Sequence, residues 1–304
     1  MTTPLSGEQY QIKFGDHQAT ICSVGAAVRE YRVGGRDVFV PFDADQVSPV
    51  YNAAILAPWP NRLGGGRYEF EGYTGQLPVN EIDRTNALHG LLCWENWWLI
   101  RHGHSDVTLE FDLPARAGWP YQLRFTVRYW LEDDGLHCRF TTTNIGQKTA
   151  PVGVGFHPWL SAGDAVLDQC EVRLDATSHV LNDSRLLPTG ETEPVAGDYD
   201  LRMRRSLAGL DLDDAWVGAT YDGEGRSWCI LYCPDGKAPA VWMDQSMDVW
   251  QVCSADHIPN YRRFGLAAEP MSCIADAFNT KDRLIELAPG TQHQVQWGAT
   301  LLDA

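Results

Sequence analysis

Strict alternation of apolar and polar residues is the clearest pattern in this chain, and it is strongest between residues 107 and 140. Apolar side chains occupy every second position over residues 107–113 and again over residues 123–131. The turn-forming sequence Asp133-Asp134-Gly135 separates the second stretch from a third one, over residues 136–140. A period of two is typical of a strand with one buried face, and an Asp-Gly turn joins antiparallel neighbours. This region therefore predicts three strands in an antiparallel meander.

The same alternation recurs near both ends of the chain, at residues 10–14 and 295–299. Helical patterns are weak by comparison, because no long window combines helical apolar spacing with capping residues at both ends. The 28 glycines and 17 prolines favour many turns over long helices. We therefore predict an all-β fold with mostly antiparallel strands and few short helices, forming a single domain over residues 1–304.

The acidic composition excludes the function classes that depend on basic surfaces. The formal net charge is −16 and the sequence pI is about 4.8, whereas nucleic acids and anionic membranes both attract clusters of lysine and arginine. A strongly anionic substrate is disfavoured for the same reason. The first eight residues lack the basic start and apolar run of a signal peptide, and no stretch is long and apolar enough to span a membrane. The eight cysteines are scattered and predict free thiols. We expect a soluble, cytoplasmic protein.

Two histidines and one glutamate are the candidate catalytic residues. His89 lies in the sequence Asn-Ala-Leu-His-Gly, His157 in Gly-Phe-His-Pro-Trp, and Glu269 in Leu-Ala-Ala-Glu-Pro-Met. Apolar surroundings raise the pKa of a carboxyl group, which suits it to proton transfer near neutral pH. Two imidazoles and one carboxylate can move protons between two oxygens of a small molecule without a metal or a cofactor.

Each of these residues also has a purely structural interpretation. A single histidine is more often a surface or hydrogen-bonded core residue than a catalyst, and Glu269 could pair with Arg262 or Arg263 at the end of a strand. The spacing alone leaves both interpretations of Glu269 open. His102-Gly103-His104 has no carboxylate or cysteine at a matching spacing, so we predict an exposed loop there and no metal site.

Tryptophan is abundant, with 12 residues in the chain. Its ring can stack on the C–H face of a sugar, but we expect at least half of these residues to serve in packing. The ones near candidate site loops, or close to them in sequence, are Trp59, Trp94, Trp97, Trp98, Trp159 and Trp250. The sequence contains no nucleophile elbow, zinc-protease motif or phosphate-binding loop.

Taken together, these motifs resemble the aldose 1-epimerase (galactose mutarotase) family. The matching segments occur in the family's order and span roughly residues 10 to 300. They are Asn61-Arg62-Leu63, Gly66-x-Tyr68-x-Phe70-x-Gly72, Leu77-Pro78-Val79-Asn80, Asn86-x-Leu88-His89-Gly90, Gly155-x-His157-Pro158-Trp159, Leu212-Asp213-Asp214-Ala215-Trp216, Glu269-Pro270-Met271 and Asp276-Ala277-Phe278-Asn279.

The resemblance implies a β-supersandwich and the interconversion of the α and β anomers of a free aldose, with glucose or galactose as first candidates. By position, Glu269 matches the general base at the C1 hydroxyl, and His157 matches the general acid at the ring oxygen. His89 matches a second histidine that helps to position that oxygen. Arg62 and Asp213 match residues that hydrogen-bond sugar hydroxyls, and Asn61 is a weaker candidate for the same pocket. No cofactor or metal is implied, and a monomer and a homodimer are both compatible with the family.

Several positions depart from the family pattern and leave alternatives open. Cys253 stands where a tyrosine is common, Trp159 replaces a tyrosine or phenylalanine, and Asp214 competes with its neighbour for the sugar. A hexose-6-phosphate mutarotase would need converging arginines, for which the sequence offers residues 62, 67 and 84. A glycosidase would use residues 213 and 269 as its carboxylate pair and leave both histidines unexplained. A non-catalytic carbohydrate-binding protein of the same fold is the third alternative.

Overall fold

A computed structural model of the protein describes residues 3–304, and its elements are almost entirely β-strands. Helical structure within these residues is limited to short segments: α1 (Ala277–Thr280) and the 3-10 turns Pro49–Tyr51, Leu167–Gln169 and Gly197–Tyr199. The expected absence of a leader segment rests partly on Met1 and Thr2, which lie outside the described residues. The prediction of an all-β fold is confirmed.

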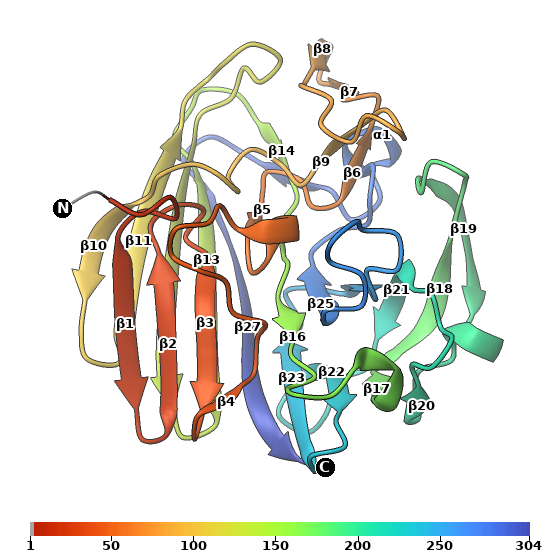
Figure 1. Cartoon of the computed structure of the whole chain (residues 1–304). Coiled ribbons are helices and arrows are strands. Elements are labelled where there is room, and N and C mark those ends of the chain that lie inside the picture. The colour runs from red at the N-terminus through yellow and green to blue at the C-terminus, as the bar shows by residue number, and fades with distance from the viewer. Residues whose placement is uncertain (1–2) are drawn as a thin grey trace.

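Two large antiparallel sheets form the body of the molecule (Figure 1). The first sheet runs in the order β10 (Trp98–His102), β11 (Asp106–Leu113), β12 (Leu123–Glu132), β13 (Gly135–Asn144), β27 (Gln292–Asp303), β23 (Lys237–Met243), β22 (Ser227–Tyr232), β17 (Glu171–Leu174) and β20 (Arg205–Ser206). The second runs in the order β19 (Pro188–Pro194), β18 (Ala176–Asn182), β21 (Asp213–Ala219), β24 (Val249–Cys253), β25 (Leu266–Met271), β15 (Gly155–Phe156) and β5 (Ile55–Leu56), and β16 (Trp159–Leu160) also pairs with β25.

Smaller sheets complete the fold. One consists of β1 (Gln9–Phe14), β2 (His17–Cys22), β3 (Val28–Val33) and β4 (Arg36–Asp37), and it lies in front of β11 and β13 in Figure 1. The others are the pairs β6 (Arg62–Gly64) with β9 (Asn86–Leu88), β7 (Arg67–Phe70) with β8 (Tyr73–Gln76), and β14 (Ala150–Val152) with β26 (Ile285–Leu287).

The predicted meander is confirmed as β11, β12 and β13. Strands β11 and β12 pair as far as Leu113↔Leu123, and strands β12 and β13 pair as far as Glu132↔Gly135. Alternate residues of β12 are buried, as the period of two predicts. The strand predicted over residues 295–299 is part of β27, which pairs with β13 and therefore lies next to the meander.

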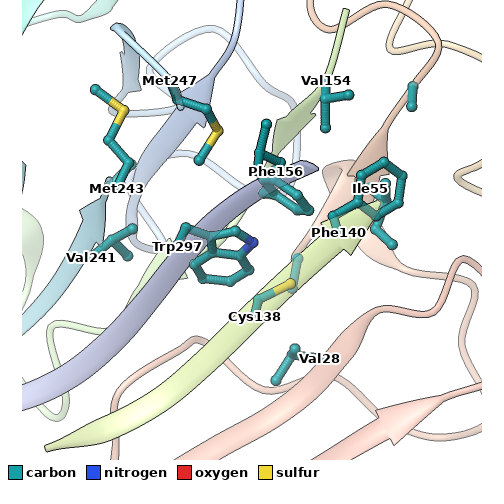
Figure 2. Packing of buried hydrophobic residues seen from close by; sticks show 14 of the residues in the cluster. Val28, Ile55, Cys138, Phe140, Val154, Phe156, Val241, Met243, Met247 and Trp297 are labelled. Atoms are coloured by element: carbon teal, nitrogen blue, oxygen red, sulfur yellow. The ribbon is translucent and has the colours of Figure 1, made fainter. Parts of the chain in front are cut away.

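The core lies between the sheets (Figure 2). Phe156, from the second sheet, packs against Trp297 and Phe140 of the first, with ring centroids 5.1 Å and 5.7 Å apart. Burial of these aromatic faces fixes β15 against the first sheet. The loop between β15 and β16 starts at the next residue, His157, so the core packing also determines where this histidine lies.

Candidate active site

A cavity of about 240 Å³ lies over the middle strands of the second sheet, where several loops converge. Its volume suits a ligand smaller than the drug-sized molecules that fill pockets of about 300–1,000 Å³. All six residues predicted from the sequence line this cavity: Asn61, Arg62, His89, His157, Asp213 and Glu269.

Glu269 lies on the floor of the cavity, in the middle of β25. This strand is buried along its whole length and lies inside the sheet, paired with β24 on one side and with β15 and β16 on the other. Burial raises the pKa of Glu269 well above its ordinary value, and the nearby Asp213 carboxylate adds to the shift. Its Oε2 atom has no hydrogen-bond partner among residues 3–304. Arg263 binds Asp256, and no arginine among residues 3–304 lies within ion-pair distance of Glu269, so the interpretation of Glu269 as the partner of Arg262 or Arg263 is wrong.

His157 faces Glu269 across the cavity floor, with its Nε2 atom 3.4 Å from Oε1 of the glutamate. Its backbone is held on both sides, because its N–H donates to the carbonyl of Ala54 and its carbonyl accepts from the N–H of Ala53. The ring stacks between Trp159 and Tyr51, at centroid distances of 5.4 Å and 6.3 Å. Burial lowers the pKa of His157 to about 3, which keeps the imidazole neutral near pH 7.

His89 lies directly after β9 and places its ring 5.1 Å from that of His157. Its backbone is left-handed, with φ of 66°, and its N–H donates to the carbonyl of Asn61, which is also left-handed, with φ of 55°. Such conformations cost free energy in residues other than glycine and are concentrated at functional sites. Burial lowers the pKa of His89 well below its ordinary value, with smaller effects from His157 and Arg62.

Arg62 is the centre of a network of charged groups in the cavity wall. Its guanidinium donates through Nε and Nη2 to the carboxylate of Glu81, at 3.0 Å to 3.1 Å, and through Nη2 to Asp213 at 3.2 Å. Asp213 also accepts a 2.8 Å hydrogen bond from Gln251. Burial opposes ionisation of Glu81, but the hydrogen bonds and the positive charge of Arg62, together with smaller contributions from Asn86 and Arg84, outweigh it and lower the pKa of that carboxyl group. The network therefore holds the polar atoms of this wall in fixed positions.

Of the two adjacent aspartates, Asp213 faces the cavity. It pairs with Cys253 at the end of β24, whereas the Asp214 side chain accepts a 3.0 Å hydrogen bond from His179. Successive side chains of a strand point to opposite faces, so only one of the two can reach the ligand. Cys253 and Trp159, both departures from the family pattern, also line the cavity.

Sequence reasoning missed Glu81, Gln251 and Tyr51, which line or support the same cavity. Tyr51 had no usable signal, because the segment Ser-Pro-Val-Tyr-Asn just before β5 lies outside both the alternating stretches and the recognised motifs. Glu81 and Gln251 also lacked a signal in the sequence, because the role of each depends on a hydrogen bond to a residue that is distant in sequence.

The other candidate groups lie away from this cavity. Arg67 is exposed on β7 and does not line it. His102 and His104 are exposed, and the Nε2 atom of His102 lies 2.8 Å from the carbonyl of Gln11. Among residues 3–304, one group of side chains brings three possible metal ligands within 4.8 Å of one another: Glu132, Asp134 and His137. It lies outside the cavity, and Arg226 already pairs with its aspartate.

The tryptophans divide much as expected. Trp59, Trp97 and Trp250 are buried in the core, and Trp159 is buried while also lining the cavity. Trp94 and Trp98 are exposed.

Comparison with known proteins decides the family. The aldose 1-epimerase family model matches residues 8–299, which is nearly the whole chain. The chain belongs to the aldose 1-epimerase family. The resemblance stated from the motifs is thereby confirmed.

Relatives and solved structures agree with this membership. The uncharacterized protein YihR of Escherichia coli K12 is 31% identical over 291 residues, covering 95% of this chain and 92% of the relative. The galactose mutarotase of Mus musculus is 25% identical over 248 residues, covering 76% of this chain and 69% of the relative. The crystal structure of an aldose epimerase homologue from C. elegans superposes with a TM-score of 0.86 at 19% identity, covering 98% and 99% of the two chains, which shows the shared fold.

Over residues 3–304, no helix has the length and apolar character that a membrane span requires.

Proposed function

We propose that the protein is an aldose 1-epimerase that interconverts the α and β anomers of a free aldose. The observation that carries the proposal is the buried pair of Glu269 and His157, which faces the cavity with 3.4 Å between carboxylate oxygen and imidazole nitrogen. Family membership and the galactose mutarotase of Mus musculus support a sugar substrate. Glucose and galactose are the first substrates to test.

The reaction needs one proton removed and one supplied at neighbouring oxygens. Glu269 takes the proton of the C1 hydroxyl while His157 delivers a proton to the ring oxygen, so the bond between C1 and that oxygen breaks and an open-chain aldehyde forms. Rotation about the bond between C1 and C2 presents the other face of the aldehyde. The ring oxygen then attacks C1, its proton returns to His157, and Glu269 returns its proton to the C1 oxygen.

The opposite pKa shifts of the two groups fit this exchange. Burial disfavours both charged forms, so at pH values between the lowered pKa of His157 and the raised pKa of Glu269 the pair holds a single proton and keeps it on Glu269. Transfer of this proton to His157 creates the ionised base and the protonated acid that ring opening requires. A bound sugar favours this transfer, because its C1 hydroxyl donates a hydrogen bond to the carboxylate.

The remaining cavity residues have positioning roles in the proposal. His89 lies beside His157 and helps to place the ring oxygen. Arg62 and Asp213 bind sugar hydroxyls, and their mutual hydrogen bond keeps a donor and an acceptor in the same wall. Asn61 contributes less, because its side-chain oxygen already accepts from the backbone N–H of the next residue.

The alternatives receive less support. A phosphosugar would need free arginines, but Arg62 and Arg84 both pair with Glu81, and Arg67 does not line the cavity. A protein that only bound sugar would need hydrogen-bonding groups but not a buried carboxyl group beside a buried imidazole, which are costly to keep in the core. A glycosidase leaves the two histidines without a role.

We further propose that residues 1–304 form a single domain that acts in the cytoplasm as a monomer or homodimer. The span of the family match supports the single domain, and the eight free cysteines of the described chain support a reducing compartment.

Polarimetry tests the proposed function directly. Freshly dissolved α-D-glucose and α-D-galactose change their optical rotation slowly on their own, and the protein should accelerate at least one of these changes. His157→Asn, which keeps a similar polar side chain but removes the acid, should lose most of the acceleration. Rates equal to the uncatalysed ones with both sugars would contradict activity toward a common free hexose.

A further inference from the structure

The hairpin of β18 and β19, on the right-hand side of Figure 1, contacts the wall of the candidate active site. Its strand β18 pairs with β21, which begins at Asp213. The loop between β18 and β19, residues 183–187, reaches the start of β9, where the side chain of Asn86 donates a 3.1 Å hydrogen bond to the carbonyl of Arg185. Asn86 and Arg185 are 99 positions apart in the chain, so the fold brings this loop to the cavity wall.

Arg185 uses its guanidinium to hold the chain at the start of β9. Its Nε atom donates to the carbonyl of Arg84 at 3.0 Å. Its Nη2 atom donates to the carbonyl of Thr85 at 2.8 Å and to Oδ1 of Asn86 at 3.0 Å. A planar guanidinium that donates to three oxygens of one segment fixes the position of that segment, which the single ammonium group of a lysine cannot do to the same degree.

The segment that Arg185 holds is strained at Thr85. The φ angle of this residue is 55°, in the left-handed region that β-branched residues rarely adopt. Its carbonyl accepts hydrogen bonds from two donors, the N–H of Gly65 and the guanidinium of Arg185. A strained backbone persists only where its surroundings hold it, so removal of Arg185 should let this segment relax.

A continuous chain of hydrogen bonds leads from Arg185 to the cavity. Asn86 is fully buried, and its amide accepts from Arg185 and donates to the carboxylate of Glu81 at 2.8 Å. Glu81 in turn accepts from Arg62, whose guanidinium also donates to Asp213. Arg185 does not line the cavity, so it can affect a ligand there only through these residues.

The loop itself presents Arg185 in a fixed orientation. The carboxylate of Asp183 accepts hydrogen bonds from the N–H groups of Arg185 and Leu187, at 2.8 Å and 3.0 Å, and the N–H of Asp183 donates to the carbonyl of Leu187. In β18, His179 binds Asp214 of β21, which ties the hairpin to the strand that carries the other aspartate. The contact is therefore formed before a ligand arrives, which limits the entropy cost of binding.

We propose that Arg185 is a positioning residue for substrate binding. It fixes Glu81 through Asn86, and Glu81 then sets the position of the Arg62 guanidinium that binds sugar hydroxyls. This inference rests on the proposed function, because it assigns Arg62 to the sugar.

The test separates KM from kcat by polarimetry, with whichever of α-D-glucose and α-D-galactose the protein accelerates more. Arg185→Ala should raise KM about threefold to tenfold, the range that corresponds to the net contribution of one hydrogen bond. The kcat value should be unchanged, because Glu269 and His157 lie outside this chain of hydrogen bonds. Arg185→Lys keeps the charge but cannot reach all three oxygens, so its KM should lie between those of the wild type and Arg185→Ala.

A double-mutant cycle with Asn86→Ala tests whether Arg185 acts through the buried amide. The KM of the double variant should rise by less than the product of the two single effects, because both substitutions interrupt the same chain of hydrogen bonds. A rise equal to that product would overturn the proposed connection. If Asn86→Ala does not fold, the order of KM values in the Ala and Lys variants of Arg185 decides the question.

Arg202→Ala is the matched control. This arginine is exposed, pairs with Asp200 and does not line the cavity. Its removal should leave both KM and kcat at their wild-type values. Thermal unfolding of each variant verifies that the proteins are folded at the assay temperature.

An unchanged KM in folded Arg185→Ala would overturn the positioning role, and so would a fall in kcat at constant KM. If the protein accelerates neither sugar, the proposed function fails, and calorimetric titration of the wild type and Arg185→Ala with glucose and galactose then measures Kd directly. A weaker Kd in the variant supports the positioning role, and equal or undetectable binding in both proteins rejects it.

Discussion

Replacing Glu269 by glutamine should abolish most of the activity and at the same time stabilise the protein at alkaline pH. The side chain is 2% exposed and lies in a strand paired on both sides. Glutamine has nearly the same shape as glutamate, so its amide fits the same space. Glutamine cannot accept the proton of the C1 hydroxyl. A positioned proton-transfer group contributes about 10²–10⁴-fold to rate, and we expect kcat/KM to fall by this factor.

The stability effect follows from the raised pKa of Glu269. Between the unfolded pKa of a glutamate, about 4.3, and its higher folded pKa, the folded protein binds more protons than the unfolded chain. The free energy of unfolding therefore falls as pH rises in this window, by up to about 1.4 kcal/mol per pH unit. Glutamine does not titrate, so the variant escapes this loss. His157 titrates in both proteins, so the difference between them isolates Glu269.

Urea unfolding at a series of pH values, together with polarimetry, measures both effects. The stability of Glu269→Gln relative to the wild type should increase from pH 5 upward, until the folded pKa is passed. Glu224→Gln is the control, because this glutamate is exposed on a turn, and it should change neither quantity. A variant that retains wild-type kcat/KM, or a relative stability that is constant with pH, would refute the reasoning.

Three further predictions test the rest of the site and the core. Asp213→Asn weakens the hydrogen bonds to Arg62 and Gln251, and steady-state kinetics should show KM raised about tenfold, since hydrogen bonds to charged groups contribute about 1.5–3 kcal/mol. The pH profile of kcat/KM should show no acid limb near pH 6.5, because the pKa of His157 is lowered to about 3, and should fall as the pH rises through the raised pKa of Glu269, where the pair loses its proton; an acid limb near pH 6.5 would contradict this. Phe156→Ala should cost about 3–5 kcal/mol in urea unfolding, as for other large core truncations.

The strands could be predicted from the sequence where one face of the strand is buried and the other is exposed to solvent. In β12 the alternation of buried and partly exposed residues is complete, and the sequence shows it directly. In β25 every residue is buried, so the period of two disappears and neither the strand's length nor its neighbours can be read from the pattern. The pairing of β13 with β27 joins segments separated by about half the chain, which local sequence does not specify.

The site was predictable to the extent that its residues lie in short sequence motifs. His89, His157 and Glu269 each stand in a distinctive segment, and the structure brings all three to one cavity. Glu81 forms a β-bridge with Asn86 and lies outside these motifs, and its role appears only through its contact with Arg62. A hydrogen bond of this kind depends on the fold and leaves no periodic signal.

The pairing of β25 with both β24 and β15 has a consequence for refolding experiments. Glu269 reaches His157 only after strands that are about 115 residues apart in sequence have aligned, and loops of this length close slowly. Local hairpins such as β12 with β13 involve neighbouring residues and should form earlier. Recovery of catalytic activity after dilution from urea should therefore lag behind the recovery of strand signal in circular dichroism, and polarimetry would then report the last stage of folding.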